Sequence, residues 1–127
     1  MKKILSLALV LAHALSFGVS YSYAGPELLG VDAGSVTSET SGAVTNATAS
    51  DRSISNWNFD IAAHETFNLA QPSSQAVALF RDFTGDASQI FGSLNANGQL
   101  FLINTNGILF GESASVNVGG LVASTLD

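Results

Sequence analysis

The sequence contains no cysteine, which excludes disulfide cross-links and thiolate metal sites. Its only histidines are His13 and His64, and without cysteine they cannot complete a zinc ligand set. A Ser/His/Asp triad cannot be inferred from one histidine next to Glu65 in a polar turn. The sequence therefore predicts no metal, no cofactor and no catalytic site, and His64 is interpreted as a surface turn residue.

Positive charge is also scarce. Lys2 and Lys3 lie at the very start, and only Arg52 and Arg81 follow. All ten acidic residues lie after residue 24, so the chain from Gly25 onward has two strong cations and a net charge of −8. This charge argues against nucleic acid and anionic lipid as partners. It also argues against a polysaccharide lyase, which needs basic residues in its groove, so a secreted β-helical polysaccharide-active enzyme is the weakest of the alternatives.

The first 24 residues have the pattern of a secretory signal peptide. Two lysines precede an almost wholly apolar stretch over residues 4–19, and Ser22-Tyr23-Ala24 places small residues before Gly25. A membrane anchor is the alternative, but the stretch is short for a bilayer that needs about 20 residues. We expect export by the Sec machinery, cleavage between Ala24 and Gly25, and one domain over residues 25–127.

The exported part is predicted to be all-β. Residues 25–50 are rich in Gly, Ser, Thr and Ala, which fits either a disordered segment or weakly patterned strands. From residue 54, short apolar runs alternate with Asn, Gly and Ser, and no stretch keeps helical spacing for three turns. Trp57 and Phe59 alternate along one such run, so we interpret both as core residues rather than as a ligand platform.

A small internal repeat places Asn-Gly before an apolar strand twice, in residues 95–101 (NANGQLF) and 104–110 (NTNGILF). Asn-Gly between apolar runs is a strong hairpin signal. Repeated turn–strand units are also typical of a parallel β-helix, in which each coil is buried by the next. The very short strands favour the β-helix. Calcium-binding nonapeptides need Asp where this repeat has Asn, so calcium is not expected.

Residues 90–127, IFGSLNANGQLFLINTNGILFGESASVNVGGLVASTLD, closely resemble the secretion domain that opens filamentous haemagglutinins and high-molecular-weight adhesins. This two-partner secretion (TPS) family has an Asn-Pro-Asn-Gly-Ile motif, followed by alternating Val/Asn residues and an Ala-Ser-Thr run. Residues 104–108 match the motif, with Thr105 in place of proline. Upstream, residues 54–80 resemble the family's Trp-containing segment, with Phe59 two positions after Trp57 where three is more usual.

The resemblance implies a right-handed parallel β-helix of the pectin-lyase-like type, capped by N-terminal strands. It also implies recognition by the periplasmic domains of an Omp85-type outer-membrane transporter, and export of a large exoprotein to the cell surface or medium. Adhesion to a host surface is the expected role of the full protein. A contact-dependent growth inhibition toxin carrier acting on neighbouring cells is the alternative.

The same resemblance implies that Asn104, Asn106, Gly107 and Ile108 form the secretion motif. Whether their asparagines are recognised by the transporter or only build a turn stays open at this level. Family domains are about twice as long as this chain, and solenoids need a cap at each end. We therefore expect a C-terminally truncated solenoid, that is, a partial secretion domain.

Overall fold

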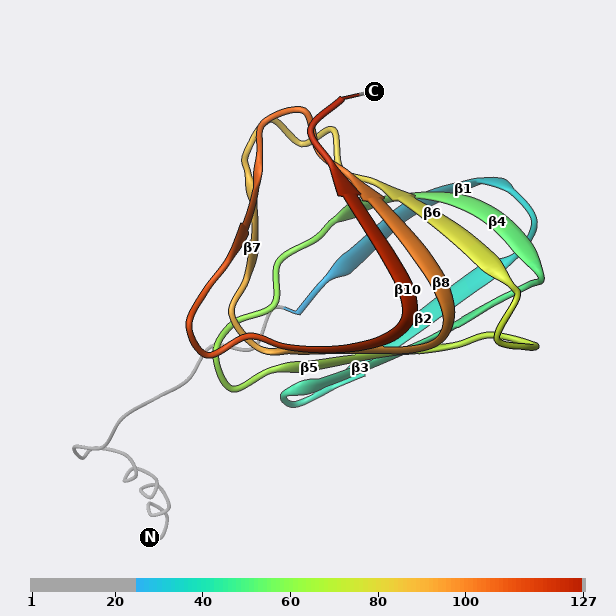
Figure 1. The fold of residues 1–127 in the computed structure, drawn as a ribbon, viewed down its shortest axis with the longest axis horizontal. Helices are drawn as coiled ribbons and strands as arrows, with labels where there is room; N and C mark the ends of the chain where they lie inside the picture. Colours follow the sequence, from blue (N-terminus) through green and yellow to red (C-terminus); the bar gives the residue numbers. More distant parts are fainter. Residues whose placement is uncertain (1–24, 127) are drawn as a thin grey trace, which may run out of the picture.

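The computed structural model describes residues 25–126, and the predicted leader, including Ala24, lies outside them. The described residues form ten strands, and no helix among them is long and apolar enough to cross a membrane. Most of the strands stack in parallel, so that the chain winds into a coil with a three-sided cross-section (Figure 1). The prediction of an all-β parallel β-helix is confirmed.

Each side of the coil is a stack of short parallel strands. The first face contains β3 (Val44–Ala49), β5 (Thr66–Ala70) and the opening halves of β8 (Ser93–Ile103) and β10 (Ser115–Ser124). The second face contains β4 (Arg52–Asn58), β6 (Val77–Arg81) and the closing halves of β8 and β10. The third face contains Ile61, β7 (Ser88–Ile90) and β9 (Ile108–Phe110). The second of the two Asn-Gly units therefore lies at a coil corner and not in a hairpin.

Two antiparallel strands cover the N-terminal edge of this stack. β1 (Glu27–Ala33) pairs with β4 on the second face, and β2 (Val36–Ser41) pairs with β3 on the first. Gly34 connects them at φ 70°, and a Cβ there would lie 2.1 Å from the carbonyl oxygen of Arg52, so only glycine fits. Of the two readings of residues 25–50, the strands are correct, and they form the predicted N-terminal cap.

Four aromatic rings fill the core beneath the cap. Trp57, Phe59, Phe67 and Phe80 are all fully buried, and their ring centroids lie 4.6 to 5.9 Å apart. The indole nitrogen of Trp57 donates to the hydroxyl of Ser55 at 2.8 Å, which satisfies its one polar atom. β4 ends at Asn58, so the run that begins at Trp57 bends at a corner while its apolar residues stay buried.

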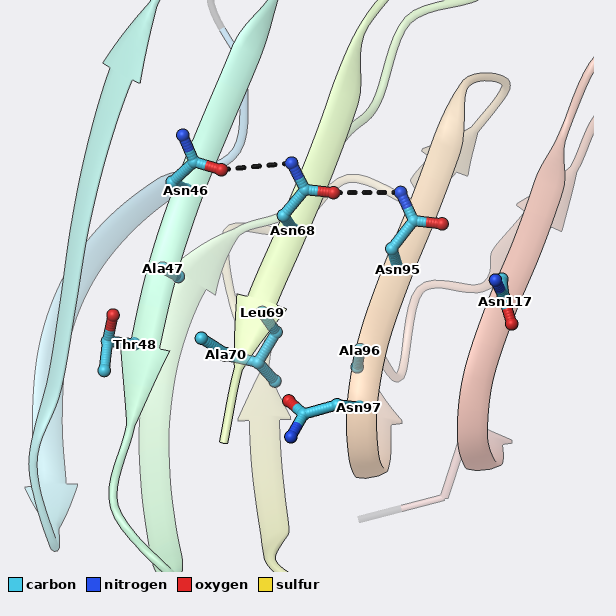
Figure 2. Close-up of a pocket in the computed structure, with 10 residues that line it drawn as sticks. All are labelled: Asn46, Ala47, Thr48, Asn68, Leu69, Ala70, Asn95, Ala96, Asn97 and Asn117. Carbon is cyan, nitrogen blue, oxygen red and sulfur yellow. Dashed lines mark hydrogen bonds between the residues drawn. The ribbon is translucent and has the colours of Figure 1, made fainter. Parts of the chain in front are cut away.

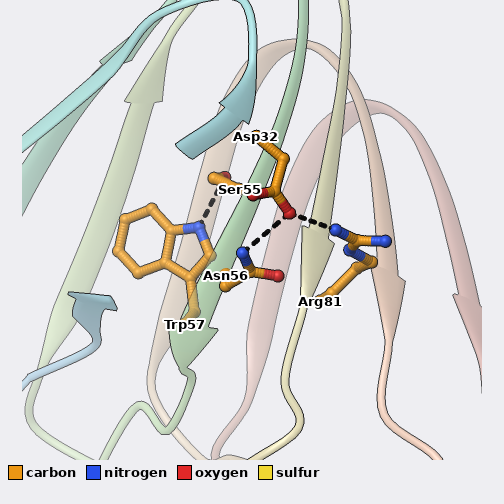
Figure 3. Close-up of polar contacts among 5 residues, drawn as sticks. All are labelled: Asp32, Ser55, Asn56, Trp57 and Arg81. Carbon is orange, nitrogen blue, oxygen red and sulfur yellow. Dashed lines mark hydrogen bonds and ion pairs between the residues drawn. The ribbon is translucent and has the colours of Figure 1, made fainter. Parts of the chain in front are cut away.

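A polar contact on the outer surface holds the cap strand to the coil (Figure 3). Asp32 of β1 accepts a hydrogen bond from the amide of Asn56 on β4 at 2.9 Å and pairs with Arg81 on β6. The Asn56 hydrogen bond, and then the charge of Arg81, lower the pKa of Asp32 despite partial desolvation. Because this pair is exposed to solvent, it positions β1 more than it stabilises the fold.

The structural period differs from the nine-residue repeat in the sequence. Asn95 on β8 pairs with Asn117 on β10, 22 residues later, so one full coil separates stacked residues. Asn97-Gly98 does not precede a strand, because it lies inside β8 at the corner between the first and second faces. The nine-residue repeat therefore records two neighbouring corners of one coil, and that part of the prediction was wrong.

Candidate functional site

The predicted secretion motif forms the corner between β8 and β9. The amide of Gly107 donates to the carbonyl oxygen of Asn104 at 3.0 Å, closing a four-residue turn. Gly107 has φ 115°, and no non-glycine residue described has a positive φ, which leaves the type I class for this turn. The side chain of Asn104 accepts from the amide of Asn106 at 2.8 Å, a contact that favours asparagine at the first turn position.

Asn104 is fully buried at this corner. Its side-chain nitrogen donates to the carbonyl oxygen of Asp86 at 2.8 Å and to the hydroxyl of Ser88 at 3.0 Å. Its backbone amide donates to the carbonyl oxygen of Ser124 on β10 at 3.0 Å, which links it to the next coil. All polar atoms of the side chain are thus used inside the protein.

Beneath Asn104, at the same corner of the preceding coil, lies a buried carboxylate. Arg81 pairs with Ile103, so Asp82 and Asn104 follow at equivalent positions. Asp82 is 1% exposed and accepts four hydrogen bonds, from the amides of Phe59 and Thr84 and from the hydroxyls of Thr84 and Ser88. Ser88 contacts both Asp82 and Asn104. These residues form a continuous polar column through the corner, which we call the corner column.

The structure separates the motif residues that the sequence had grouped. Thr105 and Asn106 are exposed at the tip of the turn, and Gly107 is half-buried. Ile108 is half-buried and pairs with Ser88 on the third face. A partner that approaches the folded corner would meet Thr105 and Asn106, whereas Asn104 lies behind them.

The other Asn-Gly unit is held differently. Asn97 and the backbone of Gln71 exchange two hydrogen bonds of 2.7 Å. The side chain of Gln71 is buried and accepts from the amide of Gly98 at 2.9 Å. A Cβ on Gly98 would lie 2.8 Å from the amide group of Gln71, so glycine is required here for close approach and not for a positive φ.

A second set of asparagines lies on the outer surface of the first face (Figure 2). The side-chain nitrogen of Asn68 donates to Asn46 at 3.0 Å, and that of Asn95 donates to Asn68 at 2.9 Å. Asn117 is next in register, but within residues 25–126 no hydrogen bond joins it to Asn95. We call Asn46, Asn68 and Asn95 the asparagine ladder. The signal in the sequence was an asparagine at the centre of each short strand run.

The ladder borders a shallow depression of about 550 Å³. None of the side chains that line it is titratable, so it offers no acid, base or nucleophile. Its lining is Asn46, Ala47, Thr48, Asn68, Leu69, Ala70, Asn95, Ala96, Asn97 and Asn117.

The remaining candidates have no surface available for a ligand or ion. His64 is exposed in the turn before β5. Trp57 and Phe59 are fully buried and cannot stack on a ligand. Within residues 25–126, no group of three His, Cys, Asp or Glu side chains could hold a metal ion.

Comparison with known proteins identifies the family. The TPS secretion domain family model matches residues 28–127. A heme/hemopexin-binding protein of Haemophilus influenzae is 41% identical over 97 residues, which are 74% of this chain and 10% of that protein. A second heme/hemopexin-binding protein, from a strain of the same species, is 44% identical over 69 residues, 54% of this chain and 8% of the other.

Among solved structures, the crystal structure of the HMW1 secretion domain from Haemophilus influenzae has the same fold. It aligns with a TM-score of 0.72 and 36% identity, over 81% of this chain and 27% of that one. The chain thus spans about a tenth or less of its curated relatives and about a quarter of the solved domain. It belongs to the TPS secretion domain family, the non-catalytic secretion module of large two-partner-secreted exoproteins.

Proposed function

We propose that residues 25–127 are the module by which an outer-membrane transporter of the Omp85 type recognises its exoprotein. Residues 1–24 direct the chain to the Sec machinery and are removed after Ala24. The periplasmic domains of the transporter then bind the module, and the exoprotein passes to the cell surface or medium. The family match over residues 28–127 is the observation that supports this proposal most.

The fold is suited to folding in one direction during export. The N-terminal edge is covered by β1 and β2, whereas each later coil is buried only by stacking on the one before it. A chain that emerges N-terminus first therefore forms its cap first, and each added coil has a template. The lack of cysteine fits passage of an unfolded chain, because no cross-link has to be opened.

Exposure decides which motif residues the transporter reaches on the folded corner. Thr105 and Asn106 are exposed, and no hydrogen bond of the described residues uses the side chain of Asn106. Asn104 shapes the turn from behind. In this proposal Asn106 contacts the transporter, and Asn104 acts by positioning it.

Co-expression with the partner transporter tests this assignment. Asn106→Ala should leave a leader-free chain in the periplasm and lower the amount in the medium, with an unchanged unfolding midpoint. Asn117→Ala is the matched control, because Asn117 is also exposed and carries no ladder bond. Normal export of the Asn106 variant would show that the motif only builds a turn.

The role of the whole exoprotein is a separate proposal. Its similarity to two heme/hemopexin-binding proteins supports binding of haem or of a haem-carrying host protein by the region beyond this module, alongside the expected adhesion. Binding of the complete exoprotein to immobilised hemopexin, with the haem-free form as a comparison, would distinguish the two roles. Absence of binding would leave adhesion.

A further inference from the structure

A buried carboxylate lies next to the first described residue. Glu65 is 5% exposed, in the turn before β5. One of its carboxylate oxygens accepts from the amide of Ala62 at 2.9 Å. The other accepts from the backbone nitrogen of Gly25 at 3.3 Å, which is long for a hydrogen bond of this kind. The backbone of Glu65 is fixed as well, through bonds to Ala62 and Ser93, so its carboxylate is held in place.

The arginines do not neutralise this carboxylate. Within residues 25–126, the ion pair between an arginine and a carboxylate is that of Arg81 with Asp32 on the second face. Both lysines precede Gly25 in the sequence. Burial of a carboxylate is costly unless it is paired and hydrogen-bonded. Glu65 is hydrogen-bonded, and a cation at Gly25 would complete its pairing.

The surroundings increase the need for a positive charge. Glu65 and Asp60 line one small pocket of about 230 Å³, together with Gly25. Burial raises the pKa of Asp60, and the charges of Asp82, Asp86 and Glu65 raise it further. A cation at this position would therefore interact favourably with two carboxylates.

Gly25 fits this position for steric reasons. Its φ is 66°, and a Cβ would lie 2.7 Å from the hydroxyl of Thr45. The next residue, Pro26, is buried, so the chain enters the cap in a fixed place. A residue other than glycine would move the nitrogen away from Glu65.

We propose that removal of the leader converts the nitrogen of Gly25 into an α-ammonium group that pairs with Glu65 and fastens the cap. Hydrolysis by a leader peptidase breaks the Ala24–Gly25 peptide bond. The hydroxyl of water joins the carbonyl carbon of Ala24, and the Gly25 nitrogen takes the other hydrogen and then a proton at neutral pH. The single N–H donor of the uncleaved chain becomes three, with a positive charge, which favours the shorter distances of charge-assisted bonds. The inference rests on the proposed cleavage after Ala24.

The consequence is a cap whose stability depends on processing. Before cleavage, Glu65 is a buried charge with only neutral donors. After cleavage, the same carboxylate connects the mature N-terminus to the turn that leads into β5. The first coil is therefore completed only in a chain that has left its leader behind.

The test uses the full 127-residue protein, exported and processed by the cell. One variant carries an extra alanine between Ala24 and Gly25, which displaces the new amine by one residue, or about 3.8 Å. We expect this insertion to lower the unfolding midpoint by about 4 °C or more. The same insertion in an Glu65→Gln background should have no further effect, and Glu27→Gln, a nearby exposed carboxylate, should preserve the loss. Equal losses in all three backgrounds would overturn the pairing.

A second measurement needs no insertion. After cleavage the α-amine is the only primary amine in the chain, so an amine-reactive ester labels it alone. Labelling of the processed wild type should be several-fold slower than that of Glu65→Gln and equal to that of Glu27→Gln. Equal rates in all three would contradict the inference. Mass spectrometry of the same samples tests the cleavage site separately, because a start other than Gly25 refutes the proposed processing itself.

Discussion

Asparagine lies both inside and outside this solenoid, and the two regions use it differently. In the corner column, Asn104 is fully buried, and its amide bonds to Asp86, Ser88 and Asn106. In the asparagine ladder, Asn46, Asn68 and Asn95 bond mainly to each other on an outer surface. Water can replace a lost bond in the ladder, but it has no access to the corner. The same side chain is therefore costly to replace in one region and inexpensive in the other.

The largest effect is expected at Asn104. Asn104→Ala leaves the carbonyl oxygen of Asp86 and the hydroxyl of Ser88 without a donor, at a cost of about 2 to 3 kcal/mol. Asn104→Asp keeps the shape but places a buried charge against that carbonyl oxygen and near Asp82. The cost then rises to about 3 to 5 kcal/mol. Urea denaturation of the processed protein measures both values, and losses below about 1 kcal/mol would mean that the corner is open to water.

Asp82→Asn supplies the reciprocal control within the same column. Asp82 accepts four hydrogen bonds, and an amide in its place directs donors at backbone amides. We expect a loss of about 1 to 3 kcal/mol. If the column tolerated both isosteric exchanges, its pattern of donors and acceptors would not be what stabilises it.

A smaller effect is expected in the ladder. Asn68→Ala removes both of its bonds because Asn68 donates to Asn46 and accepts from Asn95, and we expect a loss of about 1 kcal/mol. Asn46→Ala breaks a single bond and should cost about half as much. Asn117→Ala, which breaks none, should leave the midpoint unchanged. If Asn117→Ala destabilised the fold as much as Asn68→Ala, position on the face and not the ladder bonds would explain the loss.

The contrast between the two regions also explains what the sequence could predict. Short apolar runs between Asn and Gly predicted the parallel coil, because burial of one face per strand depends only on local alternation. The corner column could not be predicted, since Asp82, Ser88 and Asn104 come from different segments that meet only after coiling. The ladder was missed for the same reason, although its residues recur at the centre of each strand. The burial of Glu65 was missed because its turn is polar in sequence.

The smallest effect concerns the residue at which this chain departs from the family motif. Thr105 occupies the second position of a type I turn, where proline is favoured because its fixed φ matches the turn. Thr105 is exposed, and no hydrogen bond of the described residues uses its backbone amide, so proline removes no donor that the fold needs. Thr105→Pro should therefore raise stability by about 0.4 to 1 kcal/mol, mainly by restricting the unfolded chain.

Thr105→Ala is the matched control for this change, because it removes the same side chain without fixing φ. It should leave stability within about 0.5 kcal/mol of the wild type. Measured together with transporter-dependent export, the pair separates two roles of the corner. A gain in export with proline but not alanine, and in step with stability, would mean that a preformed turn presents Asn106 to the transporter. A loss of export with both variants would mean that the transporter reads the threonine side chain itself. A destabilising proline would contradict the type I assignment, because only a different backbone at position 105 would conflict with the ring.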